Sequence, residues 1–524
     1  MARTRNGIGR RTFLKGMTAA AAVPLAAHAA ASPAPATAAP SGPVDRAWMA
    51  APVQGLYRVE MDIQDCQLEG KLPSDLSGAF YRVGPDPQYP LMKGNIPFDG
   101  EGHVSMFRIA NGRVNYKSRF VRNERYLANA KAGRELFPMY RNPFMDDPAA
   151  KGVSRSTANT HIINYRDMLL ALKEDSPPTA MDLLTLETKV PNYTFGGTLP
   201  SKTFTAHPKI DSESGNLVSF GYEADGHATN AISIFEYSPK GKLLWKTKIS
   251  APYICALHDF AVTKNFISFF LMPLNIDEPQ MARGGVHWSW DGSQPSWFGY
   301  LRRGGDGKDV QWIKGATRGM FHVMGNFDDG RMLYVDMALA KSNIVSFMPQ
   351  RDGAPFDPVA ALPYTTRVSV DTSRSSPRDY KEEPLYPHTG TLPRQDDRYQ
   401  TVPYRYGYLP CPDPASGNPL DNNNCLARFD HQTHEVRLYN GGPNAVMSEF
   451  VFAPRSEKAG EGVGYLVGVV THLDRGGARE LLVFDAEHPQ DGPLASVHLP
   501  VPIVGQVHGW WVPEWQLPKA RGQA

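Results

Sequence analysis

Four of the fifteen histidines stand in distinctive sequence contexts, and clustered imidazoles are well suited to bind a catalytic metal ion. They are His207, His258, His322 and His508, separated along the chain by 51, 64 and 186 residues. No local metal-binding motif uses such intervals, and an isolated histidine is more often a surface or core residue than a ligand. If the fold brings the four together, neutral imidazoles would hold iron(II) and leave positions open for dioxygen.

The elements that would position these histidines are mostly short strands. From about Gly55 onward, runs of β-branched and aromatic residues alternate with turn signals such as Asn111-Gly112 and Asp329-Gly330. Examples of these runs are residues 78–83, 104–109, 217–222, 232–237, 260–271 and 465–470. Only residues 124–135 and 357–362 indicate helices, and both are short.

This pattern predicts an all-β chain, and the number of strands favours a β-propeller over one sandwich. Roughly 450 residues at about 60–70 per blade give about seven blades, although no sharp internal repeat is visible. The inner strands of all blades in a propeller converge on one axis. Residues far apart in sequence can therefore point at one central ion.

The contexts of the four histidines resemble the histidine motifs of the carotenoid cleavage oxygenases. The matching stretches are TAHPKID at 205–211, HDFAVT at 258–263, FHV at 321–323 and HGW at 508–510. The resemblance runs from about Gly55 to Trp515. It implies a seven-bladed β-propeller over residues 51–518, with loops and short helices capping an axial site. It also implies a non-haem Fe(2+) ion bound by His207, His258, His322 and His508.

Within that family the sequence is most similar to the lignostilbene dioxygenase branch. The supporting stretches are YRVGPDPQYP at 81–90, FDGEGH at 98–103, YRNP at 140–143 and ALKEDSP at 171–177. The resemblance implies that Phe98, Tyr140 and Lys173 contact the substrate. A hydroxystilbene carries a phenol with a pKa of about 10, and a lysine ammonium and a tyrosine hydroxyl would stabilise its phenolate. Phe98 would offer an aromatic wall.

Without the resemblance, Lys173 would be interpreted as an exposed lysine and Tyr140 as a packed aromatic residue. With it, we assign catalytic roles to both. The implied reaction cleaves the central carbon-carbon double bond of a hydroxystilbene with O2, giving two aromatic aldehydes. One alternative is an oxygenase of the same fold acting on an apocarotenoid. Another is an inactive or binding propeller with an impaired iron site.

The side chains that support the metal ligands match the family only in part. Metal-bound histidines usually donate their second N–H to a carboxylate or carbonyl group, and the resemblance assigns this role to Glu174 and Glu449. The third family glutamate is replaced by Thr391, whose hydroxyl can accept a hydrogen bond but carries no charge. Lys173 and Glu174 raise a further question, because adjacent strand residues point to opposite faces. Both can reach the site only if the strand ends or twists there.

The N-terminus is typical of an export signal. Arg10-Arg11 precedes Thr12-Phe13-Leu14-Lys15 and an alanine-rich stretch, so residues 1–31 are expected to be a twin-arginine signal peptide recognised by the Tat export machinery. A short N-terminal anchor helix is the alternative. Residues 32–50 are expected to form a flexible linker. The mature protein is then expected to have no transmembrane segment and to be periplasmic or secreted.

Composition excludes several other classes of function. The chain has 55 basic and 53 acidic side chains, which gives no electrostatic reason to expect a nucleic-acid partner. The substrate is expected to be a small aromatic or apolar molecule. The sequence has no Gly-x-Ser-x-Gly elbow, Walker loop or dinucleotide-binding motif. Of the four cysteines, Cys411 and Cys425 could form a disulfide, whereas Cys66 and Cys255 are expected to be buried thiols.

Overall fold

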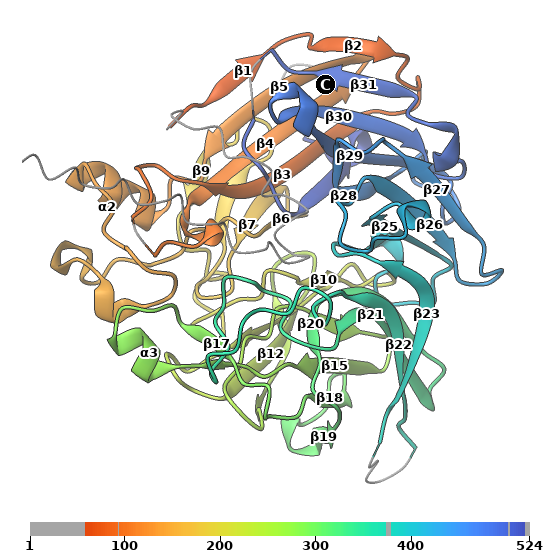
Figure 1. The fold of residues 1–524 in the computed structure, drawn as a ribbon. Coiled ribbons are helices and arrows are strands. Elements are labelled where there is room, and N and C mark those ends of the chain that lie inside the picture. Colours follow the sequence, from red (N-terminus) through yellow and green to blue (C-terminus); the bar gives the residue numbers. More distant parts are fainter. Residues whose placement is uncertain (1–57, 93, 374–378, 501–502, 519–524) are drawn as a thin grey trace, which may run out of the picture. The chain divides into compact units, whose positions relative to one another are not determined.

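Strands predominate in the computed structural model of the protein, which describes residues 58–92, 94–373, 379–500 and 503–518. Over these residues, seven sheets of four or five strands form the blades of a β-propeller (Figure 1). The predicted all-β, seven-bladed fold is confirmed. The predicted signal peptide and the linker lie outside the described residues.

The blades follow the order of the chain, except that two of them combine strands from both ends. In hydrogen-bonded order, three of them are β6 (His161–Tyr165), β7 (Met168–Leu172), β8 (Thr179–Asp182) and β9 (Thr188–Val190); β10 (Lys209–Ile210), β11 (Leu217–Tyr222), β12 (Ala231–Tyr237) and β13 (Leu243–Ser250); and β14 (Phe260–Val262), β15 (Phe266–Leu271), β18 (Trp297–Arg302) and β19 (Gln311–Lys314). Two more are β20 (Gly319–Asp328), β21 (Met332–Ala340), β22 (Tyr364–Asp371) and β23 (Lys381–Thr389); and β24 (Arg394–Gln395), β25 (Tyr406–Cys411), β26 (Cys425–Asp430) and β27 (Val436–Asn440). The last two are β28 (Ala445–Pro454), β29 (Gly464–His472), β30 (Ala478–Asp485), β31 (Ala495–His498) and β2 (Gln67–Gly70); and β32 (Gly509–Pro513), β3 (Gly78–Asp86), β4 (Glu101–Ala110), β5 (Arg113–Phe120) and β1 (Met61–Ile63).

The first strand named in each blade is the inner one. Inner strands of successive blades pack against each other, as in β14 with β20, β20 with β24, β24 with β28, β28 with β32 and β32 with β6. The C-terminal strand β32 pairs antiparallel with β3, so that Gly78 lies opposite Pro513 and Arg82 lies opposite Gly509. This pairing closes the ring of blades.

Burial explains why some strands are continuous apolar runs and others alternate. Every residue of β12 is buried, because neighbouring strands and blades cover both of its faces. The outer strand of the same blade, β13, alternates between exposed and partly buried residues over most of its length. The expected strand 217–222 coincides with β11, and the expected strand 232–237 lies within β12.

Two short helices and a two-stranded hairpin lie in connections between blade strands: the first helix lies between two blades, whereas the second helix and the hairpin lie between β15 and β18 of one blade. They are α2 (Glu124–Ala132), α3 (Glu278–Ala282), and β16 (Leu274–Ile276) paired with β17 (Trp288–Trp290). The helix expected over residues 124–135 corresponds to α2. The helix expected over 357–362 is wrong: these residues form a hydrogen-bonded turn, since Pro363 follows immediately and leaves no room for a second turn. Helix α3 was not predicted, because five residues are too few to show a helical period.

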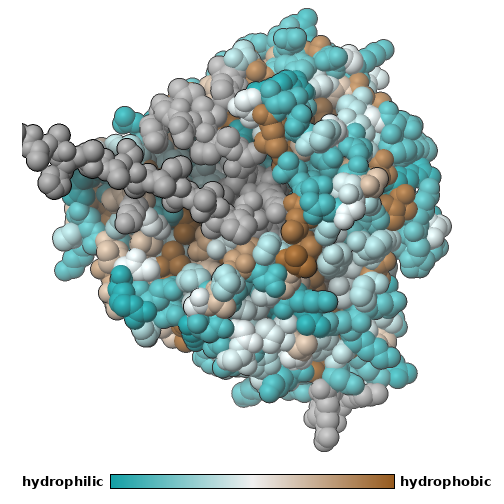
Figure 2. Space-filling model, viewed as in Figure 1, coloured by the Kyte–Doolittle hydropathy of each residue, from teal (hydrophilic) through white to brown (hydrophobic). Residues whose placement is uncertain are grey.

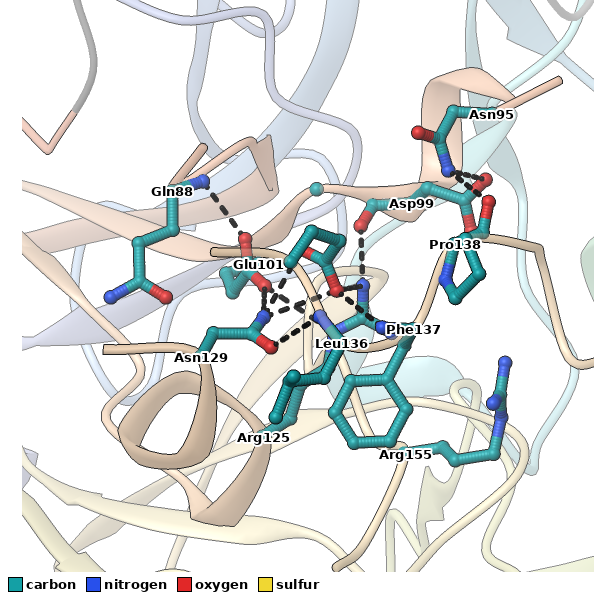
Figure 3. Close-up of polar contacts among 12 residues, drawn as sticks. Gln88, Asn95, Asp99, Glu101, Arg125, Asn129, Leu136, Phe137, Pro138 and Arg155 are labelled. Atoms are coloured by element: carbon teal, nitrogen blue, oxygen red, sulfur yellow. Dashed lines mark hydrogen bonds and ion pairs between the residues drawn. The ribbon is translucent and has the colours of Figure 1, made fainter. Parts of the chain in front are cut away.

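A buried network of hydrogen bonds and ion pairs connects α2 to the segment that carries Phe98 (Figure 3). The Arg125 guanidinium donates to the carbonyl oxygen of Asp99 at 3.1 Å, and it lies 3.3 Å from a carboxylate oxygen of Glu101 and 3.0 Å from one of Glu135. Arg125 is only 3% exposed. A buried charge is stable only when it is paired, so Arg125 must keep these contacts. The contacts therefore hold Phe98 and its neighbours in place.

The four cysteines are all buried free thiols in the structure. Cys411 and Cys425 are direct partners on the antiparallel strands β25 and β26, which explains why their positions in the sequence suggested a disulfide. Burial raises the pKa of both thiols. Cys66 and Cys255 are buried, as expected.

The surface drawn in Figure 2 is mainly hydrophilic, with apolar side chains in small separate areas. Among the described residues, no helix combines the length and the apolar character needed to cross a bilayer.

Candidate metal centre and substrate cavity

The four predicted histidines come from the inner strands of four blades. His207, His258 and His508 stand one or two residues before β10, β14 and β32, and His322 lies within β20. The register of β20 against β21 shifts on both sides of Val323, so a bulge reorients the strand next to His322. The convergence predicted for a propeller axis is therefore observed.

The Nε2 atoms of these histidines meet at one point. Nε2 of His207 lies 2.9 Å from that of His258, which lies 3.2 Å from that of His322, which in turn lies 3.2 Å from that of His508. The four potential ligand atoms all lie within 4.8 Å of one another. Burial, followed by the charge of neighbouring imidazoles, holds the pKa of His207 and of His322 well below the usual value. Both rings are therefore neutral and can offer a lone pair to a metal ion.

Two of the imidazoles are oriented by buried carboxylates. His258 Nδ1 contacts Glu174 Oε1, and His508 Nδ1 lies 2.8 Å from Glu449 Oε1. Burial raises the pKa of Glu174, but the charge and hydrogen bond of His258, with help from nearby cations, outweigh it and lower this pKa to about 2. For Glu449, the Arg394 guanidinium and His508 likewise overcome burial and hold the pKa well below its usual range. Both glutamates are ionised acceptors, which fixes the protons on Nδ1 and leaves Nε2 free.

The third supporting position has a weaker partner. His322 Nδ1 lies 3.3 Å from the Oγ1 atom of Thr391, at the site where the family glutamate was expected. Thr391 is buried, so water does not readily replace this contact. The hydroxyl orients the ring without adding negative charge. The donor set, four Nε2 atoms with three Nδ1 atoms engaged elsewhere, fits a divalent metal ion such as iron(II).

Phe98, Tyr140 and Lys173 line one cavity of about 680 Å³ together with His258, His322 and His508. Its other walls are mainly apolar and include Ala256, Leu274, Trp288, Phe321, Val345, Phe347, Met348, Leu392 and Val507. The apolar and aromatic character of these walls suits a small aromatic ligand. The three substrate-contacting residues predicted from the sequence are thus brought together beside the metal centre.

Lys173 supplies a positive charge within this cavity. Its Nζ lies 5.4 Å from the ring centre of Phe98, 5.1 Å from that of Tyr140, and 3.4 Å from Oγ1 of Thr160. The side chain is 4% exposed, so Lys173 is not a surface lysine. Burial lowers the pKa of its ammonium group, against the opposing charges of the Asp175 and Glu174 carboxylates. Burial raises the pKa of Tyr140 well above its usual value, so its hydroxyl keeps its proton.

The adjacent residues Lys173 and Glu174 reach different parts of the site because β7 ends at Leu172. Beyond the strand, the chain turns, and the alternation of strand side chains no longer applies. Lys173 therefore points into the cavity, while Glu174 contacts His258.

His161 is a fifth histidine at the centre that the sequence did not reveal. Its ring centre lies 5.2 Å from that of His207 and 5.0 Å from that of His508. Its Nδ1 lies 2.8 Å from the carbonyl oxygen of Ala206, while its Nε2 is buried without a hydrogen-bond partner. His161 belongs to a second, polar cavity of about 520 Å³ that shares His322 and His508 with the first. No motif distinguished it from the other histidines.

The comparisons with known proteins agree with this geometry. Residues 54–513 match the protein family described as retinal pigment epithelial membrane protein. The chain is 37% identical over 479 residues to the lignostilbene-alpha,beta-dioxygenase isozyme III of Sphingomonas paucimobilis, covering 88% of this chain and 96% of that protein. It is 35% identical to the isoeugenol monooxygenase of Pseudomonas nitroreducens, covering 87% and 96%.

Solved structures of similar proteins have the same fold. The lignostilbene dioxygenase of Pseudomonas brassicacearum superposes with a TM-score of 0.83 at 38% identity, covering 91% of this chain and 99% of that one. The cobalt-substituted Synechocystis ACO structure, at 24% identity and a TM-score of 0.76, shares the fold. A β-propeller with four histidines on its axis is therefore the structural class of this protein. The chain belongs to the carotenoid cleavage oxygenase family.

Proposed function

We propose that this protein is an iron(II)-dependent dioxygenase that cleaves the central double bond of a hydroxystilbene, adding both atoms of O2 to give two aromatic aldehydes. One observation carries the proposal. The buried ammonium of Lys173 and the hydroxyl-bearing ring of Tyr140 lie in the same apolar cavity as three of the four clustered histidines. The names of the lignostilbene dioxygenase relatives support the substrate class.

Iron(II), held by His207, His258, His322 and His508, would supply the activation of dioxygen at this site. Glu174 and Glu449 keep the Nδ1 protons of two of these ligands in place. Their negative charges also offset the positive charge of a bound divalent ion.

The cavity prepares the substrate electronically. A phenol that enters beside Lys173 gives up its proton more readily, because a cation in an apolar environment stabilises the phenolate strongly. The Tyr140 hydroxyl, which stays protonated, can donate a hydrogen bond to the same oxygen. Electron density from the phenolate then reaches the alkene through the conjugated ring. Phe98 and Phe321 provide aromatic surfaces for a flat ligand.

The test compares two substrates that differ only at the phenol. Iron-loaded enzyme is given 4-hydroxystilbene or 4-methoxystilbene, and aldehyde release and O2 uptake are measured. We expect turnover of the hydroxylated compound and little turnover of its methyl ether. Equal turnover of both would contradict the proposed roles of Lys173 and Tyr140.

Two other outcomes correspond to other functions. Cleavage of an apocarotenoid in preference to both stilbenes would indicate a polyene oxygenase of the same fold. Substoichiometric iron after anaerobic reconstitution, with no O2 uptake, would indicate a binding propeller. Thr391 is the observation that motivates this second possibility, because it gives His322 an uncharged partner.

We further propose that the protein is exported through the twin-arginine route after it has folded. The support is the sequence Arg10-Arg11-Thr12-Phe13-Leu14-Lys15. Cell fractionation should find the wild-type chain in the periplasm or medium, and a variant with lysine in place of both Arg10 and Arg11 in the cytoplasm. The same distribution for both chains would refute the export route.

A further inference from the structure

A second group of metal-ligating side chains lies outside the four-histidine centre. Glu223 follows β11, His227 lies in the turn after it, and His287 precedes β17. Their potential ligand atoms all lie within 4.8 Å of one another. Oε1 of Glu278, the first residue of α3, lies 3.4 Å from Nε2 of His227. Glu223 and His287 are buried, whereas the other two side chains are partly exposed, so an ion could reach them from solvent.

The environment of His287 leaves one buried ring nitrogen facing a carboxylate. Its Nδ1 lies 3.0 Å from the carbonyl oxygen of Arg141, which can only accept, so Nδ1 carries the proton. Its Nε2 lies 3.3 Å from Oε2 of Glu223 but makes no hydrogen bond, although the side chain is only 2% exposed. With the proton of a neutral ring on Nδ1, the Nε2 lone pair faces the Glu223 carboxylate, and a positive ion between the two atoms would relieve their repulsion.

Two distances between these side chains fit a tetrahedral zinc site. With bonds of about 2.0–2.2 Å, the ligand atoms of a tetrahedral zinc site lie about 3.3–3.6 Å apart. The two contacts at 3.3 Å and 3.4 Å match these edges. Zinc-bound histidines also typically donate Nδ1–H to a carbonyl group and bind the ion through Nε2. We propose that Glu223, His227 and His287, with Glu278 as the fourth ligand, form a zinc(II) site.

The charges around the site are compatible with a dication. Glu223 and Glu278 together contribute two negative charges. The Arg141 guanidinium lies 2.6 Å from Oε2 of Glu223 and opposes the ion, but it also lies 4.0 Å from the Glu174 carboxylate. Oε1 of Glu223 accepts a hydrogen bond from the backbone N–H of Ala228 at 2.8 Å, which fixes the carboxylate.

The position of the site gives it a role in shaping the substrate cavity. Arg141, whose carbonyl group holds His287, directly follows Tyr140, and Trp288 directly follows His287. Tyr140 and Trp288 both line the cavity. A zinc ion on His287 would therefore fix the ring whose hydrogen bond to Arg141 joins the two segments that carry these walls.

The experiment adds zinc to the iron-loaded enzyme and measures both metals by mass spectrometry after desalting. We expect one zinc per chain in addition to the iron, zinc X-ray absorption showing two imidazole ligands with oxygen ligands, and a higher Tm. His227→Ala should weaken zinc binding at least about tenfold and remove the Tm increase, with iron content unchanged.

Two further variants keep the test decisive. Glu278→Gln changes a partly exposed side chain, so it tests the site even if His227→Ala folds poorly, and it should also weaken zinc binding. His434→Asn alters an exposed histidine outside the cluster, at a positive φ that asparagine tolerates, and should bind zinc like the wild type. Zinc retained only in exchange for iron, or equal zinc affinity in the wild type, His227→Ala and Glu278→Gln, would overturn the proposal.

Discussion

The metal centre and the substrate cavity share three histidines but are built in different ways. The centre is formed by residues on or next to inner strands, and its supporting groups are carboxylates and one hydroxyl. The cavity is closed largely by connections between strands, and its one buried ammonium group stands among apolar walls. The difference indicates that the strands provide a common reaction centre, whereas the connections select the substrate. If so, each region can be damaged while the other still works.

The largest expected effect comes from removing one metal ligand. His322→Ala should abolish aldehyde formation and lower iron content, because three imidazoles remain and Thr391 has no ligand to orient. Binding of a hydroxystilbene, followed by quenching of tryptophan fluorescence, should remain within about threefold of the wild type, since a change below about 0.7 kcal/mol is expected for a wall residue of the cavity. Loss of binding together with iron would show that the two regions are not separable.

The next effect concerns the support of the cavity. Arg125→Ala should lower the free energy of unfolding by about 3–5 kcal/mol, because it leaves the buried carboxylates of Glu101 and Glu135 without their cation. Urea denaturation measures this change. The control is Arg134→Ala, which removes an exposed ion pair with Asp147 and should change stability little. Similar urea midpoints for Arg125→Ala and Arg134→Ala would contradict the idea that the network supports the cavity.

Lys173→Met tests the cavity without touching the metal. We expect kcat/KM for 4-hydroxystilbene to fall about 10²–10³-fold, as for the loss of a preorganised electrostatic group, while iron content stays the same. Methionine has a similar length and fills the same apolar space. The methyl ether should show little further loss in this variant. An equal loss for both substrates would mean that Lys173 acts through packing and not through the phenol.

The smallest effects come from the groups behind the metal ligands. Glu449→Gln should lower iron affinity about 10–100-fold, because the His508 proton loses its charged acceptor. Thr391→Val removes an uncharged acceptor of similar shape and should cost less. Anaerobic iron titration measures both. A larger loss for Thr391→Val than for Glu449→Gln would reverse the ranking of the two supports.

The sequence predicted the reaction centre better than its surroundings. The four clustered histidines and Phe98, Tyr140 and Lys173 could be singled out because they lie in short motifs that resemble those of a known family, and the structure brings them together. His161 was missed, because its position depends on the packing of β6 beside β32, which no local pattern encodes. The cluster around Glu223 and His287 was missed for the same reason. Helix α3 was too short to show a helical period in the sequence. Residues 357–362 showed such a period but form no helix.

The pairing of β32 with β3 has a consequence for synthesis. His508 and β32 come after the other three histidines and the other strands along the chain, so they leave the ribosome after them. Until β32 pairs with β3, a nascent chain carries three of its four metal-binding histidines and an open ring. Metal can therefore enter a complete four-histidine centre only after β32 has been made and paired. A chain truncated before His508 should retain most blades but bind the metal through three histidines at most.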